Sequence, residues 1–166
     1  MKSLIIYSSQ TGNTKKLADA VYQNLSGEKD IYDIDEAPDP NQYDFVAIGF
    51  WLMAGKPDPK SQEYLKRIKA DQSVFLFATH GAAAESDHAK KAMDYAKTLI
   101  PKGIMKEQFS CQGEVNPKVM EKIKAKENPP EWIGDAPEGK GHPDKGDFDS
   151  LKKIIKALNV TMRLFT

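Results

Sequence analysis

The chain has 166 residues, of which 40% are hydrophobic and 29% are charged, and its 24 basic residues balance its 24 acidic ones. This length predicts one compact domain over residues 1–166 with a core of its own. The neutral balance gives no reason to expect binding of nucleic acid or of an anionic membrane. The single cysteine, Cys111, excludes an internal disulfide and is typical of a reducing compartment.

Apolar runs typical of buried strands alternate along the chain with segments of helical spacing. Lys2 is followed by too short an apolar run for a signal peptide, and no apolar stretch is long enough to span a bilayer. We therefore expect a cytoplasmic protein without membrane insertion. Strands are predicted at residues 2–7, 30–34, 44–50, 73–79 and 106–112, and helices at residues 13–25, 59–68, 85–99, 117–126 and from Asp144 or Asp147 onward.

Two segments depart from this alternation. Residues 128–146 are rich in Pro and Gly and show neither the helical nor the strand period, so they are predicted to form an insertion without regular structure. Within it, Trp132 either pins the insertion to the body of the protein or belongs to a docking surface. The tail from Val160 to Phe165 either adds an edge strand or packs down.

The first strand and the first helix are joined by Ser8-Ser9-Gln10-Thr11-Gly12-Asn13-Thr14. A hydroxyl-rich turn at the start of a helix offers O–H groups, free backbone N–H groups and the positive end of the helix dipole, which together suit a phosphate. Gly12 lets the backbone approach closely. A nucleotide P-loop is excluded because the pattern Gly-x-x-x-x-Gly-Lys-Ser/Thr is lacking. The alternative is an ordinary polar turn that caps the helix.

Ser9 to Thr14 resembles the FMN phosphate loop of the flavodoxin family, which has the form Ser/Thr-x-Thr-Gly-Asn-Thr and follows the first strand. The alternation of strands and helices predicts a parallel sheet covered on both faces, a three-layer α/β/α sandwich. The resemblance implies five strands in the flavodoxin-like order 2-1-3-4-5, with the ligand beyond their carboxyl ends, where three loops meet. The residues expected to bind FMN are Ser9, Gln10, Thr11, Gly12, Asn13 and Thr14 in the first loop, Trp51, Leu52, Met53 and Ala54 in the second, and Thr79, His80, Gly81 and Ala82 in the third.

The second loop, residues 51–58, offers apolar cover for a flavin ring. Trp51 is favoured over Met53 because of the area of its indole. Alternatively, Phe50 and Trp51 alternate across the strand end, and Trp51 only covers the sheet. The resemblance also implies a peptide in this loop that turns over when the flavin is reduced. Ala54-Gly55 has the freedom for such a turn, although Gly55 is otherwise only a bend.

The third loop begins with Thr79-His80-Gly81-Ala82, where many flavodoxins carry an aromatic that stacks on the flavin. No Tyr or Trp follows here before Tyr95, so one flavin face is covered by His80 or left open. His80 alternatively points to solvent or caps the next helix, and direct chemistry by it is not expected. The backbone N–H groups of residues 79–82 are better candidates for the pyrimidine edge of the flavin.

Other polar residues predict no further site. His88 and His142 are isolated, and no group of His, Cys and carboxylates has metal-ligand spacing, so neither catalytic nor metal-binding residues are predicted. Cys111 is expected to be a buried, small apolar residue. The acidic stretch from Ile31 to Asp44 and the lysines of residues 118–126 are most simply solvated surface. The acidic stretch also lies beside the expected flavin edge, where it suits a basic partner.

The resemblance implies an FMN-binding electron-transfer protein that shuttles electrons between redox partner proteins, a reductase and an acceptor. The alternative is an FMN oxidoreductase that reduces a quinone, a tetrapyrrole or another planar small molecule at the open flavin face. The neutral charge supports this alternative, because carriers of this family are often strongly acidic. A third hypothesis, a flavin-free binding or signalling module, requires the first loop to be only a helix cap.

Overall fold

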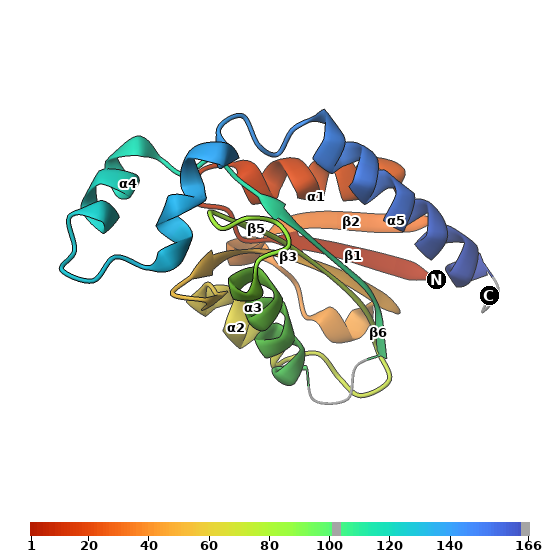
Figure 1. Ribbon diagram of the computed structural model, residues 1–166. Coiled ribbons are helices and arrows are strands. Elements are labelled where there is room, and N and C mark those ends of the chain that lie inside the picture. Colours follow the sequence, from red (N-terminus) through yellow and green to blue (C-terminus); the bar gives the residue numbers. More distant parts are fainter. Residues whose placement is uncertain (101–103, 164–166) are drawn as a thin grey trace.

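The computed structural model describes residues 1–100 and 104–163. Its centre is a parallel sheet with strands in the order β2-β1-β3-β5-β6 (Figure 1). These strands are β1 (Lys2–Tyr7), β2 (Glu28–Asp33), β3 (Phe45–Met53), β5 (Ser73–His80) and β6 (Ile104–Gln112). The predicted order 2-1-3-4-5 of five parallel strands is thereby confirmed. A further short strand, β4 (Lys56–Pro57), pairs antiparallel with the end of β3.

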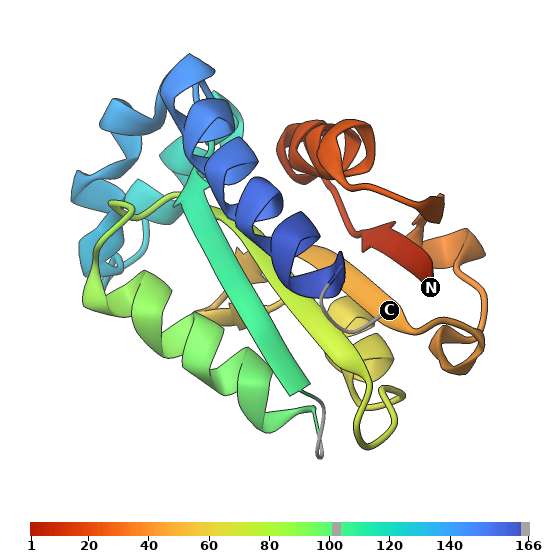
Figure 2. The same ribbon diagram turned by 90° about the vertical axis from the view of Figure 1, so that its right-hand side faces the viewer.

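Helices cover both faces of the sheet, as the three-layer prediction requires. One face is covered by α1 (Asn13–Asn24) and α5 (Lys145–Arg163), and the other by α2 (Pro59–Leu65) and α3 (Asp87–Thr98). Figure 2 shows β6 as the outer strand, with α3 and α5 on either side of it. Two 3-10 turns, η1 (Ile34–Glu36) and η2 (Pro40–Gln42), connect β2 to β3.

The apolar runs form strands because both of their faces are buried. Ile5 packs into the core under α1 and α5, whereas its neighbours Leu4 and Ile6 pack into the core under α2 and α3, and all three are fully buried. Side chains of a strand alternate between the two faces of its sheet, so a strand covered on both faces is apolar at every position. This explains the largely apolar character of the inner strands β1, β3 and β5, whereas the edge strands β2 and β6 carry charged residues.

One close approach in the core depends on a glycine. A Cβ atom at Gly49 of β3 would lie 2.1 Å from Cε2 of Phe77 on the neighbouring strand β5. The Phe77 ring therefore occupies the space that any side chain at position 49 would need. Phe77 in turn stacks with Phe75, with 5.8 Å between the ring centroids.

The second loop is more regular than the sequence predicts. β3 continues to Met53, and Ala54 and Gly55 form a two-residue turn to β4. Both turn residues have positive φ, 51° at Ala54 and 75° at Gly55, which is typical of the tight turn that matches the twist of a hairpin. Gly55 is therefore a turn residue of a hairpin.

The C-terminal part of the chain contains two further differences. α5 continues to Arg163, so the expectation of an edge strand at Val160 is wrong, and residues 164–166 lie outside the described part. The helical period extends that far because Leu151, Ile155, Leu158 and Met162 are all buried.

Residues 128–146 are not wholly irregular, because they contain the 3-10 turns η3 (Glu131–Gly134) and η4 (Ala136–Gly139). Before them, α4 (Pro117–Lys124) projects beyond the carboxyl ends of the strands (Figure 1). In residues 1–100 and 104–163, no helix combines the length and the apolar character that crossing a membrane requires.

Candidate functional site

A cavity of about 720 Å³ lies where the three predicted loops meet. Its walls include all the predicted site residues except Gly12 and Ala82. The members are Ser9, Gln10, Thr11, Asn13 and Thr14 of the first loop, Trp51, Leu52, Met53 and Ala54 of the second, and Thr79, His80 and Gly81 of the third. The parallel order of the strands brings these loops together, because all of them follow carboxyl ends of strands.

The first loop opens α1 in a way that leaves hydrogen-bond donors available. Gly12 stands at the helix N-cap with φ 93°, and no side chain among the described residues caps the helix. Ser9 Oγ accepts a bond from Gly12 N at 3.1 Å, so its own hydroxyl hydrogen remains free to donate. The first N–H groups of a helix have no partner within it. The loop is therefore a polar turn that opens α1 without a side-chain cap among the described residues.

Thr14 has a different place from its neighbours. It is fully buried, and its Oγ1 lies 2.9 Å from Oγ1 of Thr79. This bond ties the first loop, at the start of α1, to the end of β5, where the third loop begins. Thr14 lines the cavity, but its hydroxyl already has a partner within the protein.

The hairpin after β3 supplies the apolar wall that was expected of the second loop. Phe50 is fully buried in the core under α2 and α3, whereas Trp51, the next residue of β3, lines the cavity, so the two side chains alternate across the strand end. Met53 also lines the cavity, and 49% of its surface is exposed. The hairpin turn stands close to α3, because a Cβ atom at Gly55 would lie 3.4 Å from Cε1 of His88.

His80 is buried in the wall of this cavity. Only 5% of its surface is exposed, and its Nδ1 lies 2.9 Å from the carbonyl oxygen of Ala82. The expectation that it points to solvent or caps the next helix is wrong, because Ser86 caps α3. A carbonyl only accepts, so Nδ1 carries the hydrogen and Nε2 holds a lone pair. Among the described residues, Nε2 has no hydrogen-bond partner.

The imidazole of His80 is neutral at pH 7. Burial lowers its pKa to about 4; the bond to the Ala82 carbonyl acts in the opposite direction, and the nearby His88 lowers the pKa further. His80 is therefore a neutral and buried part of the cavity wall, and its Nε2 is itself buried.

Sequence reasoning missed the rest of the cavity wall, which comes from His88 and from residues 113–132. Val115, Val119, Ile123 and Trp132 contribute apolar side chains to it. Within this wall, Trp132 was the residue that the sequence singled out, and it was expected to pin the insertion or to belong to a docking surface. The structure places it in the cavity wall, far along the chain from the three loops.

Hydrogen bonds attach this wall to the third loop. The amide of Gln112, at the end of β6, donates to the carbonyl oxygens of Gly81 at 3.1 Å and of Asp135 at 2.8 Å. The carboxylate of Asp135 accepts from the backbone N–H of Ala83 at 3.2 Å. Asn13 of the first loop donates to the carbonyl of Glu114 at 3.1 Å.

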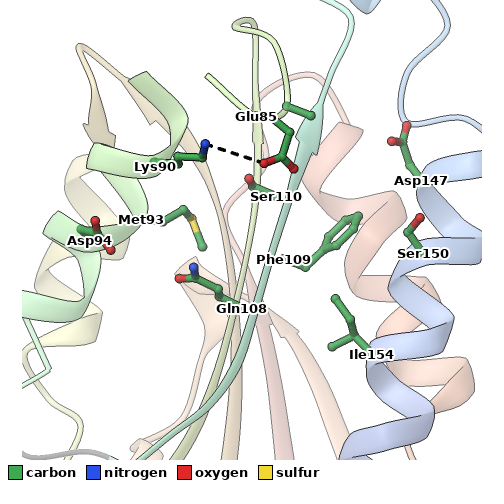
Figure 3. Close-up of a pocket in the computed structure, with 11 residues that line it drawn as sticks. Glu85, Lys90, Met93, Asp94, Gln108, Phe109, Ser110, Asp147, Ser150 and Ile154 are labelled. Atoms are coloured by element: carbon green, nitrogen blue, oxygen red, sulfur yellow. Dashed lines mark ion pairs between the residues drawn. The ribbon is translucent and has the colours of Figure 1, made fainter. Parts of the chain in front are cut away.

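A second cavity, of about 650 Å³, runs along the outer strand β6 between α3 and α5 (Figure 3). Gln108 lies toward α3 and Phe109 toward α5, and Glu85 and Lys90 form an ion pair of 3.8 Å near it. Its walls come from residues other than those predicted to bind FMN. The cavity at the three loops is therefore the candidate site.

Two other groups have structural roles. His142, Asp144 and Asp147 come together with ligand atoms within 4.8 Å, a cluster that sequence spacing did not reveal. Asp144 and Asp147 exchange backbone-to-carboxylate bonds at the start of α5, and His142 Nδ1 bonds Asp147 at 2.6 Å, so the cluster caps the helix. Cys111 is buried, and burial, followed by the charges of Asp147 and Asp144, raises its pKa far above the ordinary value. Cys111 is thus a buried residue, as predicted.

A parallel sheet of this order, covered by helices on both faces, defines a flavodoxin-like α/β protein. The sequence model of the flavodoxin domain matches residues 4–156. The chain is also 34% identical over 176 aligned positions to the flavodoxin-like domain-containing protein BilS of Clostridioides difficile (strain CD3), covering 96% of this chain and 97% of that protein. The chain therefore belongs to the flavodoxin family.

Solved structures agree on the fold. A flavodoxin from the domain Archaea superposes with a TM-score of 0.64 at 12% identity, covering 98% of this chain and 99% of that one. A flavoprotein from Lactobacillus acidophilus, solved in complex with FMN, superposes with a TM-score of 0.55 at 18% identity, covering 66% of this chain and 92% of that one. At these identities the likeness concerns the fold.

Proposed function

We propose that this chain binds FMN noncovalently in the cavity of about 720 Å³ and transfers electrons between redox partner proteins, a reductase and an acceptor. The observation that carries the proposal is the start of α1, where an uncapped helix, Ser9 and Thr11 converge on the cavity. All side chains that the first loop contributes to the cavity are neutral, so the phosphate would be held by hydrogen bonds and by the helix dipole.

The rest of the cavity suits the flavin ring. Trp51 and Met53 offer apolar area for one face of a flat heterocycle. The buried, neutral His80 is part of the same wall. When bound, FMN supplies the redox chemistry, and the protein holds the ring, excludes water and sets the surroundings of its nitrogens.

The phosphate assignment is tested with a charge placed in the loop. Thr11 is exposed and lines the cavity, so Thr11→Glu puts a carboxylate beside the phosphate without disturbing the core. Because charged hydrogen bonds are lost and repulsion is added, we expect the Kd for FMN to rise roughly 10-fold to 100-fold. Gln23→Glu, an equal change of charge at an exposed position of α1, is the matched control. Thr14 is unsuitable for this test because it is buried and bonded to Thr79.

Riboflavin, which lacks the phosphate, makes the test specific. The natural chain is expected to bind FMN more tightly than riboflavin, and Thr11→Glu is expected to remove that difference. Absorption and fluorescence titrations measure both ligands. Failure of the natural chain to bind either flavin would overturn the proposal, and equal affinity for both would overturn the phosphate site.

A second candidate function is the direct reduction of a planar small molecule, such as a quinone or a tetrapyrrole. The balanced charge favours it, because an electron carrier of this family is often strongly acidic. Stepwise anaerobic reduction of the FMN-loaded protein, followed by visible absorption, separates the two functions. Reduction in two distinct one-electron steps supports the carrier, whereas a single two-electron step with turnover of NAD(P)H and a quinone supports the oxidoreductase.

A further inference from the structure

We propose that Trp132, with Val119 and Ile123 of α4, covers the ring of the bound flavin on the side where the third loop has no aromatic residue. This inference rests on the proposed FMN site. It assigns a binding role to a segment, residues 117–134, that lies outside all three of the predicted loops. The C-terminal part of the chain would then cover one side of the ring.

Trp132 packs directly against the third loop. A Cβ atom at Gly81 would lie 2.6 Å from Cζ3 of Trp132 and 2.9 Å from Cγ2 of Val115. The absence of a side chain at Gly81 therefore makes room for the indole. The ring also lies 6.2 Å from that of His88, measured between centroids. Trp132 thus stands over the third loop, where a stacking aromatic of that loop is lacking.

The apolar face of α4 is only partly buried. The helix is amphipathic, yet each of its residues keeps part of its surface exposed, and Val119 is 44% exposed. Val119 and Ile123 are four residues apart, so they share one face of the helix, and both line the cavity. A helix whose apolar face borders a cavity gains burial when an apolar group fills that cavity. A flat aromatic ring system has the required shape and character.

Hydrogen bonds hold this segment in place at both ends. Gln112 bonds to both Gly81 and Asp135, and Asp135 bonds to Ala83, which attaches the insertion to the third loop. Asn13 bonds to the carbonyl of Glu114 just before α4. Between these attachments, α4 contacts mainly η3. Trp132 therefore has a defined position, while α4 has room to settle on a ligand.

The test uses Trp132→Ala, with Trp132→Phe as a conservative variant and Tyr22→Ala as a control. Tyr22 is an exposed aromatic of α1, outside the cavity wall. We expect Trp132→Ala to raise the Kd for FMN and for riboflavin by the same factor, at least threefold, and to increase the fluorescence of the bound flavin, because a stacked indole quenches it. Trp132→Phe is expected to recover most of the affinity, and Tyr22→Ala to change nothing.

A second readout is protection of α4 from trypsin. Lys118, Lys122 and Lys124 are exposed cleavage sites on this helix. FMN is expected to slow cleavage there in the natural chain and less so in Trp132→Ala.

The inference is overturned if Trp132→Ala binds both flavins with natural affinity and leaves their fluorescence unchanged. In that case a preference of the natural chain for FMN over riboflavin would still support the phosphate site. Circular dichroism checks that Trp132→Ala is folded. Trp132→Phe keeps an aromatic ring in the wall, so its affinity for flavin tests the cover independently of that variant. If the natural chain binds no flavin, both the cover and the proposed function fail.

Discussion

Because the imidazole of His80 is buried, we expect the folded chain to lose stability in acid. Its pKa is about 4 in the folded chain because the ring is buried, against 6.5 for a free histidine. The unfolded chain therefore binds a proton more readily than the folded chain does between these values. The stabilisation is fully present above pH 6.5 and is lost as the pH falls through about 4. Replacing His80 by Gln removes this proton and keeps a polar side chain that is able to donate to the Ala82 carbonyl.

The size of the effect follows from the two pKa values. Between pH 7 and pH 5, linkage predicts that the natural chain loses about 2 kcal/mol of unfolding free energy through His80 alone. Carboxylates titrate in both proteins, so their contribution cancels in the difference. Urea unfolding of the flavin-free natural chain and of His80→Gln at both pH values measures that difference. We expect the gap between the two proteins to shift by about 2 kcal/mol in favour of the variant at pH 5. A gap that does not change with pH would refute the assignment of a buried, neutral imidazole.

Three further predictions concern stability and reactivity. Gly49→Ala places a methyl group 2.1 Å from Cε2 of Phe77. We therefore expect the free energy of unfolding, measured in urea, to fall by about 1–3 kcal/mol. Gly134→Ala, where a Cβ atom meets nothing within 4 Å, is the control and should change little. Thr14→Val or Thr79→Val alone leaves a buried hydroxyl unpaired and should cost about 1–3 kcal/mol, whereas the double variant should cost less than the sum of the two; strict additivity would argue against the bond. Cys111 should resist a thiol reagent at pH 8 in the folded chain and react at once in denaturant, and rapid reaction of the folded chain would contradict its burial.

How well each part of the site could be predicted depends on how far apart its residues lie in the sequence. The first loop was predictable because a strand, a turn and a helix follow one another within a few residues, and Ser9 to Thr14 carries its pattern locally. The second loop lines the same cavity as the first, but its hairpin was not foreseen, since the turn Ala54-Gly55 acquires its conformation from the pairing of β4 with the end of β3. The neutral state of His80 was not foreseen either. A buried acceptor nitrogen depends on packing from several loops at once.

The alternation of strands and helices, the parallel sheet and the loop that opens α1 could be predicted, because hydrophobic period and turn chemistry are local properties of the chain. The position of residues 113–134 depends instead on tertiary packing. Pro- and Gly-rich segments have no period from which a position can be read, and Trp132 reaches the cavity through contacts with Gly81, about fifty residues earlier in the chain. The same holds for the last turns of α5, where the burial of Met162 extends the helix through Val160. Such positions are set by the packing of distant segments, which local sequence preferences do not encode.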